Sequence, residues 1–210
     1  IQTLQTMIDM RPDLSSFSRV SYARELYGDL DGAIAMMQAA VQAGGPASEN
    51  SAWVRVQLGN LFFAQGNLAA AEQQYQGTLT LLPDYVYAQA GLARVRAAQG
   101  QVRAAVALYQ QSIARMPLPE FVIGLGELYE SQGRAADAAK QYELVRAMEQ
   151  LFKANGVDTD LELALFDADH GADAGATVAL ARAAYARRPS IKAADTLGWA
   201  LLRAGQVDEA

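Results

Sequence analysis

Glycine recurs along this chain of 210 residues at an interval close to 34 residues. The glycines that mark the interval are Gly28, Gly66, Gly100, Gly133, Gly171 and Gly205. Three of the five intervals are 33 or 34 residues long, and the other two are 38. A fixed period of this length is the sequence signature of a repeat architecture, in which each unit packs only against its neighbours. We therefore expect an array of repeated units.

The segment 53–83 shows the repeated unit most clearly, with the sequence WVRVQLGNLFFAQGNLAAAEQQYQGTLTLLP. It reads as two amphipathic helices joined by a turn at a Gly-Asn pair. The first helix carries a Leu-Gly pair and then an aromatic residue, and the second carries an alanine and then an aromatic residue, before a closing proline. These residues are Leu58, Gly59, Phe62, Ala71, Tyr75 and Pro83. Gly59 and Ala71 are expected to be small because the two helices cross there.

The same pattern predicts five complete repeats with half a repeat at each end. The predicted repeats are 13–45, 52–83, 84–117, 118–156 and 157–189, and the half repeats are 1–12 and 190–210. The first longer interval is explained by a turn-rich connection at 44–48, with the sequence GGPAS. Arg24 and Arg96 stand where the first-helix aromatic is expected.

The fourth and fifth repeats depart from the pattern. The second helix of the fourth is predicted to continue through Phe152 to a cap at Asn155 and Gly156. In the fifth, Asp167 replaces the first-helix aromatic, and the alanine and aromatic positions of the second helix fall on Ala176 and Leu180. The final stretch, 190–210, restores a regular first helix with LGWAL.

By these residues the chain resembles the tetratricopeptide repeat family, and the resemblance covers essentially the whole sequence. It implies an all-α fold, a right-handed superhelical solenoid of antiparallel helix pairs. In such arrays the first helix of each pair lines a concave groove, in which related proteins mostly bind a peptide or a partner protein. The Ala- and Arg-rich residue usage is similar to that of bacterial members.

Residues opposite the core stripe of each first helix are expected to face the groove. The candidate groove residues are Tyr22, Trp53, Asn60, Phe63, Tyr87, Arg94 and Glu127. The aromatic members would anchor an apolar segment of a ligand, or they would instead pack against a neighbouring repeat. Asn60 is favoured as a contact because an amide offers both a donor and an acceptor to a peptide backbone.

The second half of the expected groove is acidic. Its carboxylates are those of Glu120, Glu127, Glu130 and Glu162. They would select basic residues of a partner, or they would form an ordinary solvated face.

One known binding mode of the family can be tested on the sequence. Members that bind chaperone tails hold a terminal carboxylate with Lys and Asn side chains at fixed groove positions. The corresponding positions carry Ser18 and Tyr22 in the first repeat, and Tyr87 and Gly91 in the third. The clamp is therefore absent from these repeats, and we do not expect a chaperone-tail adaptor.

Composition argues against several other functions. The net charge is −6, so nucleic acid is not an expected partner, and the absence of Cys removes thiolate metal sites and Cys nucleophiles.

The run DADHGAD at 167–173 contains the sole His, His170, but its spacing fits no known metal motif. We interpret Asp169 and His170 as the end of one helix and Asp173 as the cap of the next. We expect no cofactor, no metal and no enzymatic activity.

The sequence thus predicts a non-enzymatic scaffold that binds a protein or peptide in the concave groove. The alternative is a helical region for interaction or oligomerisation within a larger enzyme or membrane-anchored assembly. Self-association through the ends of the array is a third possibility, since half repeats leave apolar faces such as those of Leu4 and Leu201 partly uncovered.

No apolar run is long enough to cross a membrane. The chain starts without Met and stops inside a repeat, so we expect truncation at both ends, and the compartment cannot be read.

Overall fold

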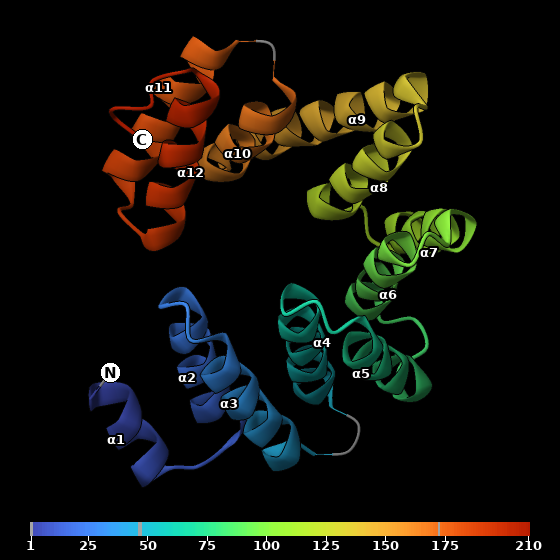
Figure 1. Cartoon of the computed structure of the whole chain (residues 1–210), viewed down its shortest axis with the longest axis vertical. Coiled ribbons are helices and arrows are strands. Elements are labelled where there is room, and N and C mark those ends of the chain that lie inside the picture. The colour runs from blue at the N-terminus through green and yellow to red at the C-terminus, as the bar shows by residue number, and fades with distance from the viewer. Residues whose placement is uncertain (1, 46–47, 172) are drawn as a thin grey trace. The chain divides into compact units, whose positions relative to one another are not determined.

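The computed structural model describes residues 2–45, 48–171 and 173–210, so residues 46 and 47 of the turn-rich connection, and residue 1 of the first half repeat, lie outside the described residues. The described residues form twelve helices and no strand (Figure 1). The helices are α1 (Gln2–Met10), α2 (Leu14–Leu26), α3 (Leu30–Ala43), α4 (Glu49–Ala64), α5 (Leu68–Leu81), α6 (Val86–Ala98), α7 (Val102–Arg115), α8 (Pro119–Ser131), α9 (Ala135–Ala154), α10 (Asp160–His170), α11 (Ala174–Arg187) and α12 (Ile191–Arg203). The predicted long second helix of the fourth repeat is confirmed, because α9 reaches Ala154.

Consecutive helices pack as hairpins. The pairs α2–α3, α4–α5, α6–α7 and α10–α11 are in close contact, and each second helix up to α7 also packs against the first helix of the following hairpin. First helices touch one another as well, with α4 against α6 and α6 against α8. This nearest-neighbour pattern is what the 34-residue period predicts.

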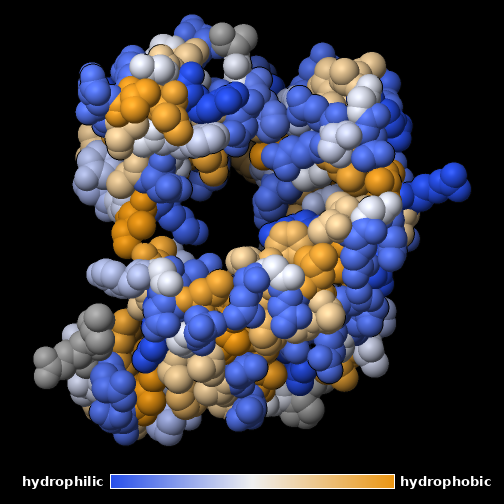
Figure 2. All heavy atoms as spheres, viewed as in Figure 1, coloured by the Kyte–Doolittle hydropathy of each residue, from blue (hydrophilic) through white to orange (hydrophobic). Residues whose placement is uncertain are grey.

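The chain divides into two compact units, residues 1–138 and 139–210, and the division falls inside α9. The first unit holds two core clusters. One is centred on Met37, Val54 and Leu58, and the other on Tyr75, Leu92 and Val95. The core of the second unit joins α10, α11 and α12. Apolar residues also reach the surface among polar ones (Figure 2), as is usual for a folded protein.

Five of the six glycines that mark the repeat adopt positive φ angles, between 70° and 83°. They end the first helix of each hairpin in the left-handed conformation that side chains disfavour. Gly171 is the exception, because its φ is −81°. A Cβ at Gly171 would collide with the backbone carbonyl of Asp167, so steric room is what requires glycine there.

The fifth repeat differs from the expected register by one residue. Ala176 is exposed, whereas Thr177, Ala181 and Ala184 are buried. The carboxylate of Asp173 accepts a hydrogen bond from the Ala176 backbone N–H at 2.9 Å, which starts α11 at Ala174. The assignment of Ala176 and Leu180 to the alanine and aromatic positions is therefore wrong, because this cap sets the phase of the helix.

Polar residues at the aromatic position of the first helix form ion pairs. Arg96 approaches Glu72 of the preceding hairpin to 2.6 Å, and both side chains are largely buried. Arg24 pairs with Asp29 at 2.6 Å. In these two repeats an ion pair thus replaces the aromatic contact that the repeat pattern predicts at this position.

The aromatic ring of Tyr75 fills the space that the small residues leave. Gly59 and Ala71 are both buried, and a Cβ at Gly59 would lie 2.6 Å from the Tyr75 ring. A Cβ at Gly91, on the first helix of the following hairpin, would lie closer still to the same ring. Tyr109 repeats the arrangement one hairpin later, 2.7 Å from a Cβ built at Gly124. Tyr75 therefore passes between two successive first helices at glycine, and Tyr109 meets a glycine of the first helix that follows it.

We predict that Gly91→Ala lowers the free energy of unfolding by about 1–3 kcal/mol, because a methyl group inserted into a packed interior forces its neighbours apart. Urea unfolding followed by circular dichroism measures the change. In a Tyr75→Leu background, Gly91→Ala should lower the free energy of unfolding much less, because the ring that the new methyl group would meet is absent.

The matched control is Gly77→Ala, because a Cβ at this helical glycine of α5 meets no atom within 4 Å. It should stabilise the protein by about 0.5–1 kcal/mol through helix propensity alone. Equal effects of the two substitutions would contradict the role assigned to Gly91.

Candidate functional site

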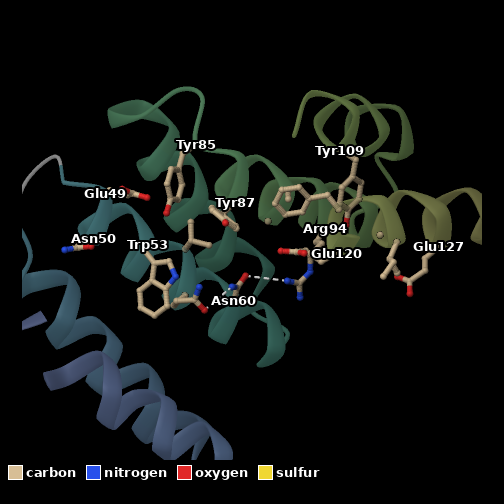
Figure 3. A pocket seen from close by; sticks show the side chains of 17 residues that line it. Glu49, Asn50, Trp53, Asn60, Tyr85, Tyr87, Arg94, Tyr109, Glu120 and Glu127 are labelled. Atoms are coloured by element: carbon tan, nitrogen blue, oxygen red, sulfur yellow. Dashed lines mark hydrogen bonds between the residues drawn. The ribbon is translucent and has the colours of Figure 1, made fainter. Parts of the chain in front are cut away.

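A hollow of about 770 Å³ opens on the first unit. It is lined mainly by the first helices of three successive hairpins, α4, α6 and α8, which come together because Gly59, Gly91 and Gly124 allow close packing around two tyrosines. Figure 3 shows the lining side chains directed into this space. The hollow has the size of a site for a few side chains of a ligand.

The structure brings together five of the seven predicted groove residues. Trp53, Asn60, Tyr87, Arg94 and Glu127 all line the hollow. Their role in peptide binding stays a prediction.

The other two predicted residues do not line the hollow. Phe63 lies beneath the guanidinium of Arg94, whose Cζ is 4.4 Å from the ring centroid. Tyr22 is on α2 and is 46% exposed. Phe63 therefore contacts Arg94, a lining residue, without lining the hollow itself.

One end of the hollow is aromatic. The rings of Tyr85 and Tyr87 lie 5.6 Å apart, and Tyr87 meets Phe121 edge-on at 5.8 Å. Trp53 adds an indole that is 44% exposed. Such tilted and edge-to-face pairs hold the rings in fixed positions, so this end offers a pre-formed apolar surface.

Sequence reasoning missed three aromatic residues that line the hollow, Tyr85, Tyr109 and Phe121. Tyr85 precedes the first turn of α6 as its N-cap, and Phe121 lies in the first turn of α8, so neither was on the expected groove stripe. Tyr109 belongs to a second helix, α7, whereas the expected groove residues lie on first helices. The available signal for Tyr109 was the glycine at 124, which leaves room for its hydroxyl.

The middle of the hollow is polar. The hydroxyl of Tyr75 donates to Asn60 Oδ1 at 2.7 Å. Arg94 Nη1 approaches the same oxygen at 3.5 Å (Figure 3). The Asn60 amide nitrogen is 3.4 Å from the side-chain oxygen of Gln57. The acceptor of Asn60 is therefore already engaged within the protein, and only its N–H groups remain as donors to a ligand.

Two tyrosines of the second helices are difficult to ionise: Tyr109, which lines the hollow, and Tyr75, which is fully buried behind Asn60. Burial raises the pKa of Tyr75 and of Tyr109 to about 12, although the positive charge of Arg94 opposes the rise at both. The charge of Glu127 adds to the rise at Tyr109. Both hydroxyls thus stay protonated at neutral pH and act as hydrogen-bond donors.

The hollow also carries three carboxylates. Glu49 belongs to the first turn of α4, and Glu120 and Glu127 belong to α8. Arg94 is the one arginine among the lining residues. The lining as a whole is therefore acidic, with one positive charge in its middle.

The acidic run at 167–173 belongs to the second unit and behaves as a pair of helix ends. Helix α10 ends at His170, and Asp173 caps α11, as predicted. Asp169 accepts a hydrogen bond from the Trp199 indole at 2.9 Å, and Asp167 pairs with Arg146. Ala172 lies outside the described residues. Within the described part of the chain, no three His, Asp or Glu side chains lie together so as to hold a metal ion.

Helix α9 carries one buried acid in the second unit. Glu149 is 8% exposed, and burial raises its pKa to about 7, with the charge of Asp167 adding to the rise and that of Arg146 opposing it. Nearby, Tyr142 and His170 stack at 4.3 Å beside Phe166. This cluster is a structural contact between α9 and α10.

The tetratricopeptide repeat model matches three overlapping stretches of the sequence, residues 27–86, 56–118 and 90–150. Together these stretches cover more than half of the 210 residues. The chain belongs to the tetratricopeptide repeat family. The family resemblance and the predicted all-α solenoid fold are confirmed. Proteins built from these repeats generally serve as non-enzymatic scaffolds for protein interactions.

Solved structures share the fold at low sequence identity. The crystal structure of MamA is 20% identical, with a TM-score of 0.56 over 73% of this chain and 88% of that chain. TTC0263, a thermophilic repeat protein of Thermus thermophilus, is 21% identical, with a TM-score of 0.59 over 68% of this chain and 77% of that one. The Cut9–Hcn1 crystal structure of the APC/C matches at 17% identity and a TM-score of 0.62, over 95% of this chain but 38% of the other.

These identities support the fold alone. No curated protein matches the sequence. In the described residues, no helix is both long and apolar enough to cross a membrane.

We predict that the free energy of unfolding falls between pH 10 and 12. In this range the unfolded chain releases tyrosine protons that Tyr75 and Tyr109 retain in the folded protein, so each residue contributes a loss of up to about 1.4 kcal/mol per pH unit. Urea unfolding across this range should show a shallower decline for a Tyr75→Phe/Tyr109→Phe variant. The exposed Tyr27 provides the control, because Tyr27→Phe should leave the slope unchanged.

A second prediction concerns Glu149. Its raised pKa means that the folded protein binds a proton between pH 4.5 and 7 that the unfolded chain releases, so this acid destabilises the fold increasingly above pH 4.5. Glu149→Gln should therefore raise the free energy of unfolding at pH 8, by on the order of 1–3 kcal/mol. The gain should vanish near pH 4. The same change at the exposed Glu143 should have little effect, and a gain independent of pH would contradict the assignment.

Proposed function

We propose that this chain is a non-enzymatic binding module that takes an extended peptide segment into the hollow of its first unit. The observation that carries the proposal is the pre-formed aromatic end, where Tyr87 is fixed between Tyr85 and Phe121 at ring distances of 5.6 and 5.8 Å. Rings already held in place lose little conformational freedom on binding, so their contact area contributes more to affinity.

The lining favours a peptide over a small apolar ligand. The hollow extends across α4, α6 and α8, and its lining combines aromatic rings with amide, guanidinium and carboxylate groups. A segment of several residues satisfies such a surface, because different side chains of one chain meet each part. Basic residues of the same segment would approach Glu120 and Glu127.

Two other expectations from the sequence stay predictions. They are the repeat boundaries and self-association through the ends of the array. The acidic side chains Glu130 and Glu162 lie outside the residues that line the hollow, so the proposal places no ligand contact on them.

A peptide-display selection tests the proposal. We expect the 210-residue chain to enrich peptides of about ten residues that carry an aromatic or large apolar side chain, and to bind them measurably by fluorescence anisotropy. Tyr87→Ala should weaken that binding by about 30-fold, which corresponds to the roughly 2 kcal/mol typical of a central aromatic contact.

The matched control is Tyr27→Ala, because Tyr27 is 75% exposed and lies outside the hollow. It should leave affinity unchanged. Circular dichroism and urea unfolding of both variants separate lost contact from lost fold. Binding that survives in a folded Tyr87→Ala protein would place the ligand elsewhere and overturn the proposal.

A further inference from the structure

We infer that the hollow selects a peptide with an internal acidic residue, whose carboxylate binds at Arg94 between the Asn60 amide and the Tyr109 hydroxyl. The inference rests on the proposed function, and it names the chemistry of the ligand at one position of the same site. The preferred ligand is a segment in which an aromatic residue precedes or follows the acid and a basic residue lies on its other side.

Arg94 differs from other arginines of the first unit in its surroundings. Arg24, Arg96 and Arg134 each pair with a carboxylate at 2.6–2.7 Å. The Arg94 side chain is exposed, and no carboxylate of the described residues lies within 4.0 Å of it. Its charge is therefore available to a ligand.

The guanidinium of Arg94 is also held in position. It stacks on Phe63 with 4.4 Å between Cζ and the ring centroid, and it touches Asn60 Oδ1 at 3.5 Å. Stacking leaves the in-plane N–H groups of a guanidinium open, and these form the paired hydrogen bonds that a carboxylate accepts. A fixed arginine also loses less side-chain entropy on binding.

Two further donors border the same space. Tyr109 lines the hollow with a hydroxyl that makes no hydrogen bond to the rest of the described chain, although the residue is 5% exposed. Arg94 and the Tyr75 hydroxyl both contact Asn60 Oδ1, and Arg94 and Tyr109 line the same hollow. The Asn60 amide adds N–H groups, because its oxygen is already engaged. Arg94, Asn60 and Tyr109 thus each offer N–H or O–H donors to an anionic acceptor.

The lining on either side of Arg94 favours an internal acid over a chain terminus. In Figure 3, Arg94 lies between Trp53, Tyr85 and Tyr87 on one side and Glu127 on the other, with Glu120 beside it. A terminal carboxylate at Arg94 would leave one of these two surfaces without a ligand residue. A segment that continues in both directions places an apolar side chain on the aromatic end and a basic one beside Glu127.

A positional selection with capped peptides tests this inference. The probe is a randomised pool of decapeptides that are N-acetylated and C-amidated, so that every carboxylate in the pool belongs to an Asp or Glu side chain. A second pool has the same sequences with a free C-terminus. We expect the native chain to enrich capped peptides with an acid near an aromatic residue, and replacement of that acid by its amide to weaken binding by about tenfold or more.

Charge reversal at Arg94 provides the decisive comparison. Arg94→Glu should lose the preference for the acid and favour Lys or Arg at the same peptide position. The control is Arg103→Glu, which makes the same change of charge at an exposed residue of α7 outside the hollow, and it should keep the native preference. Both variants are checked for native unfolding curves, and Arg94→Gln, which keeps a polar side chain of similar length, should lose the preference without reversing it.

The outcomes separate this inference from the function on which it rests. Capped peptides that need Tyr87 but show no preference for an acid would overturn the inference and leave the proposed function standing. Binding confined to the pool with free C-termini would also overturn it, in favour of a terminal carboxylate. A pool from which no Tyr87-dependent peptide is recovered would overturn the proposed function and this inference together.

Discussion

The packing of Tyr75 between Gly59 and Gly91 is the contact on which the rest of the first unit depends. The ring belongs to a second helix, but the two glycines belong to the first helices of successive hairpins, so one side chain joins three helices. Glycine at both positions leaves room for the ring, which is fully buried. Tyr109 and Gly124 repeat the contact one hairpin further along. The repeat period is thus expressed as a recurring tyrosine–glycine contact.

The same contact determines the chemistry of the hollow. A tyrosine that passes between two first helices carries its hydroxyl to their far side, and Tyr75 meets Asn60 there at 2.7 Å. Tyr109 lines the hollow although it is largely buried, so core residues bring polar groups to a surface site. The polar middle of the hollow is therefore a consequence of core packing, and Arg94 adds the charge.

The second unit shows how a repeat departs from its pattern while keeping the helical hairpin. Asp167 replaces an aromatic and pairs with Arg146, and Gly171 serves the turn without a positive φ. The Asp173 cap then sets α11 one residue away from the register that the repeat pattern predicts. In an alanine-rich helix the apolar residues are spread almost evenly around the axis, so the sequence does not specify which face is buried. The hydrogen bond at the start of α11 therefore decided its buried face.

The sequence by itself determined the helical repeat, the position of the turns and six of the residues that line the hollow, Glu120 among them. Glycine spacing and the pattern of small and aromatic residues reflect contacts between neighbouring hairpins. The sequence did not reveal Tyr85, Phe121 and Tyr109 as lining residues, nor that the oxygen of Asn60 is already bonded. These depend on how close successive first helices approach and where each ring lies between them. Only the tertiary structure fixes those distances, because they join residues on different helices.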